Sequence, residues 1–489
     1  MSMRSHMKRK KMFVVLLVLS FCSQLMAQTI APFKAGDKIA FVGNSITDAG
    51  FYHSYIWLYY MTRFPDRRIQ IINKGIGGDD AGLINNRLHV EVFPEKPTVL
   101  ALTFGMNDSG YFEYLNEKKD SLAQVKWQKS FDSYQQVEAK LKQHIGIRKI
   151  IFTTAPYDET TTSAKNNYYP GKTKTIERII QFQKASAQKN GWEFLDLNKE
   201  MTAINLQQQA KDPAFSLSPG DRIHPGVGGH LVMAYFFLKA QGMAGKPVAD
   251  VAIDATAKEV LKQENCTVTN LSIQPGLLAF DYLAKSLPFP IDTLPRMWNS
   301  NSNQREALAV IPFMAEMNRE ALQVKGLLPG TYTLKIDEQK IGDWTATDFA
   351  AGINLAAHMN TPQYQQASVI RDLNQERMEI ERRFRQYNWM EFDVLREKGL
   401  LRKHNQQALD SVMAFVPPLS NRLILSTHLL VPAPVKVRPA STTVWEKHFL
   451  APLRLMDWCR LVPIPSRGVT MVRVTATNTR ALKVLPLPN

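Results

Sequence analysis

The sequence lacks several features that would place it in common protein classes. Only 3 of its 489 residues are cysteine, too few for a scaffold built on disulfides or for a zinc site made of four thiolates. Charged residues make up 21% and hydrophobic residues 45%, which matches neither a disordered chain nor a coiled-coil fibre. After residue 28 no apolar run is long enough to span a membrane. These absences predict a globular protein of two or three domains.

The net charge of +16 is compatible with binding to nucleic acid, but the basic residues are not arranged for it. Basic residues at 8–11, an apolar stretch at 12–21 and Ala27 form the pattern of a secretory signal peptide. Cleavage after Ala27 would lower the net charge to +11. The basic residues after 441 are spread among Val, Thr and Pro rather than clustered with aromatics. We therefore expect a secreted or periplasmic protein, with no nucleic-acid partner and no integral membrane segment after signal removal.

The three cysteines have different contexts. Cys22 lies inside the predicted signal, and the bulky Phe21 before it disfavours lipoprotein processing. Cys266 and Cys459 remain in the mature chain. The sequence leaves open whether these two thiols pair in an oxidising compartment or stay free.

Residues 28–245 alternate short β-rich runs with longer helical ones. The runs predicted as strands are residues 38–42, 68–73, 98–104, 149–153 and 192–197. Helical spacing fills the intervals, for example at 124–143 and 173–190. Strands that alternate with helices join through right-handed crossovers into a parallel sheet covered on both faces. We predict a flavodoxin-like, three-layer α/β/α domain with a five-stranded parallel sheet and functional residues at the carboxyl ends of its strands.

The alternation of β-rich and helical runs ends at about residue 245. Alternating antiparallel strands are predicted at 267–273, 277–282, 321–324 and 332–336. Residues 363–400 predict a charged helix, and no periodicity is visible after 440. The predicted organisation is therefore a signal peptide at 1–27, the α/β domain at 28–245, a β-rich, sandwich-like and helical accessory region at 246–440, and an irregular basic tail at 441–489.

Four motifs follow predicted strands, and two of them suggest nucleophilic catalysis. The four are GNSIT at 43–47, NKGIGGDD at 73–80, GMND at 105–108 and DRIHPG at 221–226. Ser45 lies on a strand-to-helix turn, where it can be an exposed nucleophile or merely a helix N-cap. Asp221 stands three residues before His224, so its carboxylate can orient the imidazole and leave the other ring nitrogen free to take a serine proton.

The two middle motifs offer hydrogen-bond donors. The glycines of residues 75–78 can present backbone N–H groups to a ligand, or form an ordinary flexible connection. Asn107 can donate its amide to an oxyanion, or can form an Asx turn at the end of a strand. Asp79 and Asp80 have no neighbouring His or Cys, so we interpret them as solvated carboxylates or a helix cap rather than as metal ligands.

Together the four motifs resemble those of the SGNH hydrolases, within the GDSL esterase/lipase superfamily. The resemblance covers about residues 36–245. It implies that Ser45 is the nucleophile, His224 the general base and Asp221 its orienting acid. It also implies an oxyanion hole formed by the Ser45 N–H, the Gly78 N–H and the Asn107 amide.

Two details qualify the resemblance. Asn44 stands where the family name implies Asp, but this residue takes no part in proton transfer. The glycine donor is assigned by alignment of the motif, with Gly77 as the alternative. The chemistry requires no metal and no organic cofactor.

We predict from these features an exported serine esterase that hydrolyses short-chain, acetyl esters on carbohydrate, with an acylated small molecule or glycan as substrate. One alternative is a lipase or lysophospholipase, for which YFEYL at 111–115 is the nearest candidate for an apolar lid. These aromatic residues could instead stack on a sugar or belong to the core. Another alternative is a noncatalytic carbohydrate-binding protein on the same fold.

Overall fold

The computed structural model describes residues 30–163, 167–297, 302–337, 339–387 and 470–476. The chain divides into two compact units. Among the described residues, the first consists of 30–56, 69–163, 167–244, 293–297 and 302–311, and the second of 57–68, 245–292, 312–337, 339–387 and 470–476. The predicted signal peptide and Cys459 lie outside the described residues, and Cys266 is a buried free thiol.

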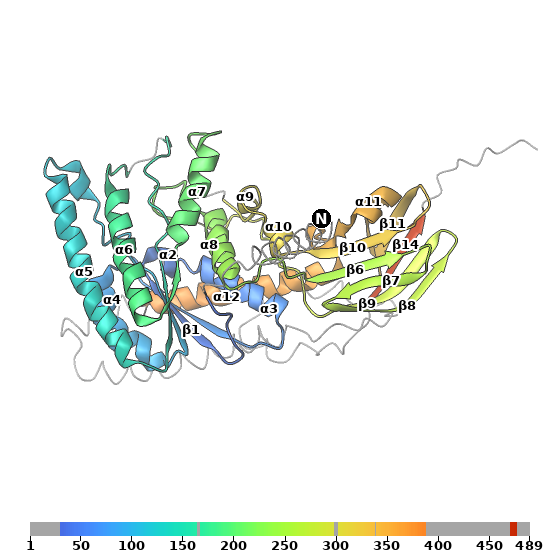
Figure 1. Ribbon diagram of the computed structural model, residues 1–489, viewed down its shortest axis with the longest axis horizontal. Coiled ribbons are helices and arrows are strands. Elements are labelled where there is room, and N and C mark those ends of the chain that lie inside the picture. Colours follow the sequence, from blue (N-terminus) through green and yellow to red (C-terminus); the bar gives the residue numbers. More distant parts are fainter. Residues whose placement is uncertain (1–29, 164–166, 298–301, 338, 388–469, 477–489) are drawn as a thin grey trace, which may run out of the picture. The chain divides into compact units, whose positions relative to one another are not determined.

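A five-stranded parallel sheet forms the centre of the first unit (Figure 1). Its strand order is β2-β1-β3-β4-β5. Its strands are β1 (Lys38–Gly43), β2 (Gln70–Gly75), β3 (Val99–Leu102), β4 (Arg148–Phe152) and β5 (Glu193–Leu195). After β2 the chain crosses back over β1, so that β1 and β3 lie side by side with their carboxyl ends at one edge. The predicted parallel α/β sheet is confirmed.

Helices cover both faces of this sheet. The helices of this unit are α2 (Ser45–Asp48), α3 (Phe51–Arg63, whose first half belongs to this unit), α4 (Ala81–Arg87), α5 (Lys119–Gln143), α6 (Lys172–Asn190), α7 (Leu197–Gln209), α8 (Val227–Ala240) and α9 (Arg305–Leu308), the last of which packs on α8. The π-helical turn η1 (Leu88–Val92) and the 3₁₀ turns η2 (Phe93–Glu95) and η3 (Phe112–Leu115) lie in the connections between α4, β3 and α5. Ile84, Val137 and Ile179 of α4, α5 and α6 join one core cluster with the strands. On the other face, Phe41 of β1 packs on Phe237 of α8 with ring centroids 5.6 Å apart.

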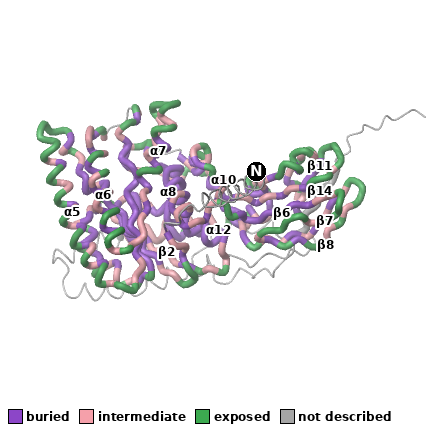
Figure 2. Tube along the Cα trace, viewed as in Figure 1, coloured by how far each residue is buried: buried purple, intermediate pink, exposed green. Residues whose placement is uncertain are grey.

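The helix α8 is apolar on nearly every side because it is buried on nearly every side. Figure 2 shows it buried along most of its length, whereas α5 exposes its outer face. Among the described residues, no helix combines the length and hydrophobicity needed to cross a membrane.

Two sheets make up most of the second unit. One has the order β13-β10-β6-β7 and the other β12-β11-β14-β9-β8. Their strands are β6 (Ala249–Asp254), β7 (Glu259–Glu264), β8 (Cys266–Gln274), β9 (Leu277–Ala284), β10 (Glu320–Lys325), β11 (Thr331–Ile336), β12 (Gln339–Thr345), β13 (Ile353–Asn354) and β14 (Thr470–Ala476). Side chains of both sheets, such as Val251, Phe280, Leu322 and Leu334, share one hydrophobic cluster. The helical elements are α10 (Phe313–Glu316), α11 (Ala346–Ala351), η4 (Leu355–Ala357) and α12 (Pro362–Tyr387).

Part of this unit differs from the sequence prediction. We expected no regular structure after residue 440, whereas β14 forms a strand paired on both sides, with β9 and with β11. The strands that pair with β14 lie far away in the sequence, so no local sequence pattern predicts this strand. The edge strand β7 was also missed, because four of its six residues are charged or amide side chains and most are exposed. The helix predicted at 363–400 is described as far as Tyr387.

Candidate active site

Ser45 is the first residue of α2, and Asn44 alone separates it from the end of β1. The side chain of Asn44, which has an extended backbone, accepts a hydrogen bond from the Ile46 N–H at 3.1 Å. This N-cap starts a helix immediately after the strand. Either Asn or Asp can supply the capping oxygen, which gives a structural reason why Asn44 can occupy this position. The Ser45 N–H is itself a first-turn amide, a group that has no acceptor within its own helix.

Ser45, His224 and Asp221 form a continuous hydrogen-bonded chain. The Ser45 Oγ lies 2.8 Å from His224 Nε2, and His224 Nδ1 lies 2.5 Å from Asp221 Oδ2. The other oxygen of Asp221 accepts the backbone N–H groups of Ile223 and His224, at 2.9 and 2.8 Å. Burial would raise the pKa of Asp221, but its hydrogen bonds with His224 outweigh burial and hold the pKa below its usual value. The ionised carboxylate keeps the proton on Nδ1, so Nε2 can accept the serine proton.

Close packing of β2 against α2 fixes where the first two motifs meet. In the parallel register Gly43 of β1 lies opposite Gly75 of β2. A Cβ atom at Gly75 would lie 2.2 Å from the backbone nitrogen of Asp48 in α2, so only glycine fits. The Asn73 side chain then donates to the Asp48 carbonyl at 3.1 Å. The nucleophile helix is therefore packed directly on the end of β2.

Asn107 is clamped at both ends of its amide. Its Nδ2 donates to the Asp79 carbonyl at 2.8 Å, and its Oδ1 accepts a hydrogen bond from the Tyr111 hydroxyl at 2.6 Å. These two bonds fix which side of the amide carries the nitrogen. Gly78, which precedes Asp79, is exposed and has a φ of 85°, in the left-handed region that favours glycine. Asn107 thus contacts the loop that carries Gly78.

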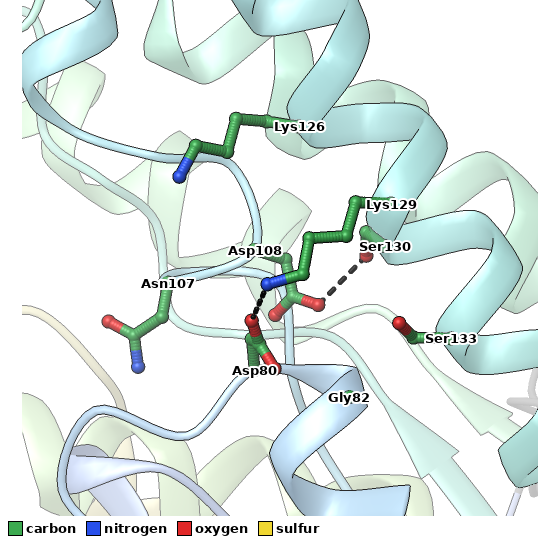
Figure 3. Close-up of a pocket in the computed structure, with 8 residues that line it drawn as sticks. All are labelled: Asp80, Gly82, Asn107, Asp108, Lys126, Lys129, Ser130 and Ser133. Atoms are coloured by element: carbon green, nitrogen blue, oxygen red, sulfur yellow. Dashed lines mark hydrogen bonds and ion pairs between the residues drawn. The ribbon is translucent and has the colours of Figure 1, made fainter.

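A small pocket lies between α4, α5 and the loop after β3 (Figure 3). It is lined by Asp80, Gly82, Asn107, Asp108, Lys126, Lys129, Ser130 and Ser133. Figure 3 shows Asp108 turned towards Ser130 of α5, with Asn107 leaving the same loop in another direction. Asp108 accepts hydrogen bonds from Ser130 at 2.8 Å and from the backbone of Ala81 and Gly105, each at 2.9 Å. It anchors the loop from which Asn107 projects, and burial raises its pKa despite these bonds.

Only one of the two neighbouring aspartates fits the sequence interpretation. Asp80 caps α4 by accepting a backbone hydrogen bond at 2.9 Å, as predicted. Asp79 is not solvated: it is 2% exposed, and its carboxylate accepts a hydrogen bond from Arg87 Nε at 2.7 Å. Arg87 also donates to the carbonyls of Gly43 and Lys74, at 3.2 and 2.8 Å, and so ties the first two motifs together. Among the described residues, no three His, Cys, Asp or Glu side chains gather as a metal site would require.

Arg222 holds the last motif in place, a role that the sequence did not reveal. Its backbone is left-handed, with a φ of 67°. Its guanidinium donates to the carbonyls of Asp158 and Thr161, at 3.1 and 2.8 Å, in the loop after β4. The segment with Asp221 and His224 is thereby fixed to the sheet edge. An arginine within a loop motif gives no signal of such a contact in the sequence alone.

The aromatic segment 111–115 divides into three environments. Tyr114 is buried and donates to the Ser109 carbonyl at 2.6 Å, so this residue belongs to the core. Phe112 and Leu115 are 76% and 65% exposed. Tyr111 faces Asn107, as described above. The segment therefore reaches the candidate site through Tyr111, a residue for which the sequence gave no specific role.

Comparison with known proteins agrees with this geometry. Residues 41–232 match the GDSL-like lipase/acylhydrolase family, and residues 368–417 match the diltiazem deacetylase C-terminal helical domain. The chain is 42% identical to a gut microbial diltiazem-metabolizing enzyme of known structure, over 92% of this chain and 100% of that one, with a TM-score of 0.82. It is 25% identical over 231 residues to an acetylxylan esterase of Geobacillus stearothermophilus, a match that spans 42% of this chain and 95% of the relative.

Proposed function

We propose that this chain, which belongs to the GDSL-like lipase/acylhydrolase family and is a carboxylic ester hydrolase, cleaves short acyl esters by two-step transfer through Ser45. The observation that carries the proposal is the continuous series of hydrogen bonds from Ser45 through His224 to Asp221. The Ser45 Oγ lies 2.8 Å from His224 Nε2, and His224 Nδ1 lies 2.5 Å from Asp221 Oδ2. A noncatalytic binding protein would have no need of this alignment.

In the first step the Ser45 Oγ attacks the ester carbonyl while its proton passes to His224 Nε2. Asp221 stabilises the imidazolium that forms. The negative charge on the carbonyl oxygen is accepted by the Ser45 N–H, the Gly78 N–H and one N–H of the Asn107 amide. When the intermediate collapses, the C–O bond to the alcohol breaks and the leaving oxygen takes the proton from His224. In the second step water attacks the acyl-enzyme by the same route and releases the acid.

The experiment that tests this function is Ser45→Ala with p-nitrophenyl acetate as substrate. We expect turnover to fall by about 10⁴–10⁶-fold, because no other group replaces the nucleophile. Ser121→Ala is the matched control, since this serine is exposed and, among the described residues, its hydroxyl bonds to the Lys118 carbonyl at the end of its own helix. A fluorophosphonate probe should label the parent and the control but not Ser45→Ala. Turnover by Ser45→Ala at the rate of the parent would refute the nucleophile.

For the substrate we propose an acetyl ester, on carbohydrate or on a drug-like small molecule. The similarity to an acetylxylan esterase supports carbohydrate, and the similarity to a diltiazem-metabolizing enzyme supports a small molecule. Acetate release from acetylated xylan and from diltiazem separates these two. Comparison of acetyl with decanoyl p-nitrophenyl esters tests the lipase alternative, which predicts preference for the longer chain. The N-terminal sequence pattern supports action outside the cytoplasm.

A further inference from the structure

Lys172, the first residue of α6, is a buried lysine that the proposed mechanism does not use. It is 0% exposed. This position is unfavourable for a cation on two grounds. Burial removes the ammonium from water, and the N-terminus of a helix carries the positive end of its dipole. A buried ammonium at a helix N-terminus needs contacts that offset both penalties. The groups that make these contacts indicate the role of Lys172.

The ammonium of Lys172 is held by the loop that carries Asn107. Its Nζ lies 2.6 Å from the Met106 carbonyl and 2.6 Å from the Ser109 hydroxyl, and it also donates to the Gly110 carbonyl. Three acceptors match the three N–H donors of an ammonium group. Because they lie on either side of Asn107 in the sequence, one side chain fixes the loop before and after the proposed oxyanion donor.

The same ammonium also lies over the ring of Tyr111. Its Nζ is 3.8 Å from the ring centroid, well within the range of a cation–π interaction. The Tyr111 hydroxyl donates to Asn107 Oδ1 at 2.6 Å. Burial and the negative charge of Asp221 raise the pKa of Tyr111, so its hydroxyl keeps the proton that it donates. A positive charge against the ring strengthens the hydroxyl as a donor, and hydrogen bonds in such a chain polarise one another.

The Asn107 amide has two N–H groups, and the Asp79 carbonyl occupies one of them at 2.8 Å. With its oxygen bound to Tyr111, the amide cannot rotate, and no described residue accepts the second N–H. That N–H is the one available to an oxyanion.

We propose that Lys172 is a positioning residue, which acts through Tyr111 and the 106–110 loop to hold and polarise the Asn107 amide as an oxyanion donor. The inference rests on the proposed function, since an oxyanion forms only in acyl transfer. It predicts that losing the ammonium lowers turnover more than it weakens substrate binding, because the oxyanion is absent from the bound ester and develops only in the transition state and the tetrahedral intermediate.

The charge of Lys172 also makes this arrangement sensitive to pH. Burial lowers the pKa of Lys172 to about 7, while the carboxylates of Asp108 and Glu113 raise it and Lys126 lowers it. The rings of Tyr111 and Tyr157 also face the ammonium, and Nζ lies 5.8 Å from the centroid of the Tyr157 ring. As pH rises through neutrality the ammonium loses its proton, so the support of Asn107 should weaken and kcat should fall on the alkaline side.

The test is a double-variant cycle of Lys172→Met and Tyr111→Phe, with kcat and KM for p-nitrophenyl acetate and a melting temperature for each protein. Tyr111→Phe removes only the hydroxyl that binds Asn107. We expect each single variant to lower kcat about 10- to 100-fold, with KM changed less than threefold. The double variant should be no slower than the slower single one, because both changes interrupt one chain of contacts. Lys172→Met should also lose the alkaline fall of kcat.

Tyr169→Phe is the matched control. Its ring lies 5.5 Å from the Tyr111 ring, but its hydroxyl contacts Asn167 at 3.3 Å rather than Asn107. If Lys172→Met does not fold, Lys172→Gln retains amide donors for the loop carbonyls without the charge. A kcat for Tyr111→Phe within twofold of the parent, or additive losses in the double variant, would overturn the inference. Fluorophosphonate labelling of Ser45 in every variant shows separately whether the proposed function stands.

Discussion

The Asp221 carboxylate illustrates how single residues control this site. It accepts hydrogen bonds from the imidazole and from two backbone N–H groups of the segment it belongs to. These contacts hold its pKa below the usual value although burial works against them. The carboxylate therefore stays ionised throughout the neutral range, and the proton of His224 stays on Nδ1.

Replacement of this charge should separate catalysis from folding. Asp221→Asn keeps the shape of the side chain but removes the acceptor that fixes the tautomer, so we expect kcat to fall by about 10³–10⁴-fold. The melting temperature should change little by comparison. Steady-state kinetics on p-nitrophenyl acetate measures the loss of kcat. Asp132→Asn is the control, because Asp132 is an exposed residue. Less than a tenfold loss would mean that Asp221 does not orient the base.

At the scale of elements, the decisive contact is that between the end of β2 and the short helix α2. Gly75 lies so close to α2 that a methyl group would meet backbone atoms of Thr47 and Asp48 at 2.6 and 2.2 Å. Backbone cannot rotate away as a flexible side chain can. The position of Ser45 thus depends on a glycine of a different strand.

Gly75→Ala should displace α2 and with it the Ser45 hydroxyl. Because the φ of Gly75 is not in the left-handed region, the effect is steric alone. A shift of about 1 Å in a reacting group costs on the order of 10²-fold in rate, and overpacking destabilises by about 1–3 kcal/mol. Turnover and urea unfolding of the variant measure both effects. Gly146→Ala, with open space around it, should match the parent, and an unaffected kcat in Gly75→Ala would contradict this account.

At the scale of the whole molecule, Glu320 connects distant parts of the chain within the second unit. This carboxyl group in β10 is 1% exposed and accepts hydrogen bonds from Tyr282 of β9 at 2.9 Å and Gln363 of α12 at 3.0 Å. Burial raises its pKa to about 7, although those hydrogen bonds and the charge of Arg63 lower it. The folded chain therefore binds a proton at pH values where the unfolded chain has lost it.

The pH dependence of stability follows from this shift. Between the ordinary pKa of Glu, about 4.3, and about 7, the unfolded state binds fewer protons, so the free energy of unfolding falls as pH rises. Glu320→Gln cannot titrate and should lack this contribution, which is at most roughly 1.4 kcal/mol per pH unit. Urea unfolding at pH 5, 6, 7 and 8 measures the free energy of unfolding of both proteins. The value for the variant minus that for the parent should rise up to pH 7 and stay constant above it. The exposed Glu259→Gln should follow the parent, and parallel curves for Glu320→Gln would exclude the shift.

The strands and helices with a regular hydrophobic pattern could be predicted, because that pattern lies in neighbouring residues of the sequence. Residues 38–42 were predicted as a strand and form most of β1, and 173–190 form nearly all of α6. The strands β6 and β7 were missed, and β14 lies in a stretch predicted to be irregular. For β7 and β14 the cause is physical: an exposed edge strand carries little apolar pattern, and a strand held by partners from elsewhere in the chain need not carry one of its own.

The sequence by itself determined the α/β alternation and the four motifs at strand ends, because hydrophobic periodicity and turn chemistry are written in neighbouring residues. It could name Ser45, Asn107, Asp221 and His224 as candidates but could not measure the distances between them. Only the tertiary structure decided that Arg87, Tyr111, Lys172 and Arg222 surround these residues. Their contacts join segments up to 66 residues apart, and a buried charge finds its partners through the packing of the folded chain rather than through spacing in the sequence.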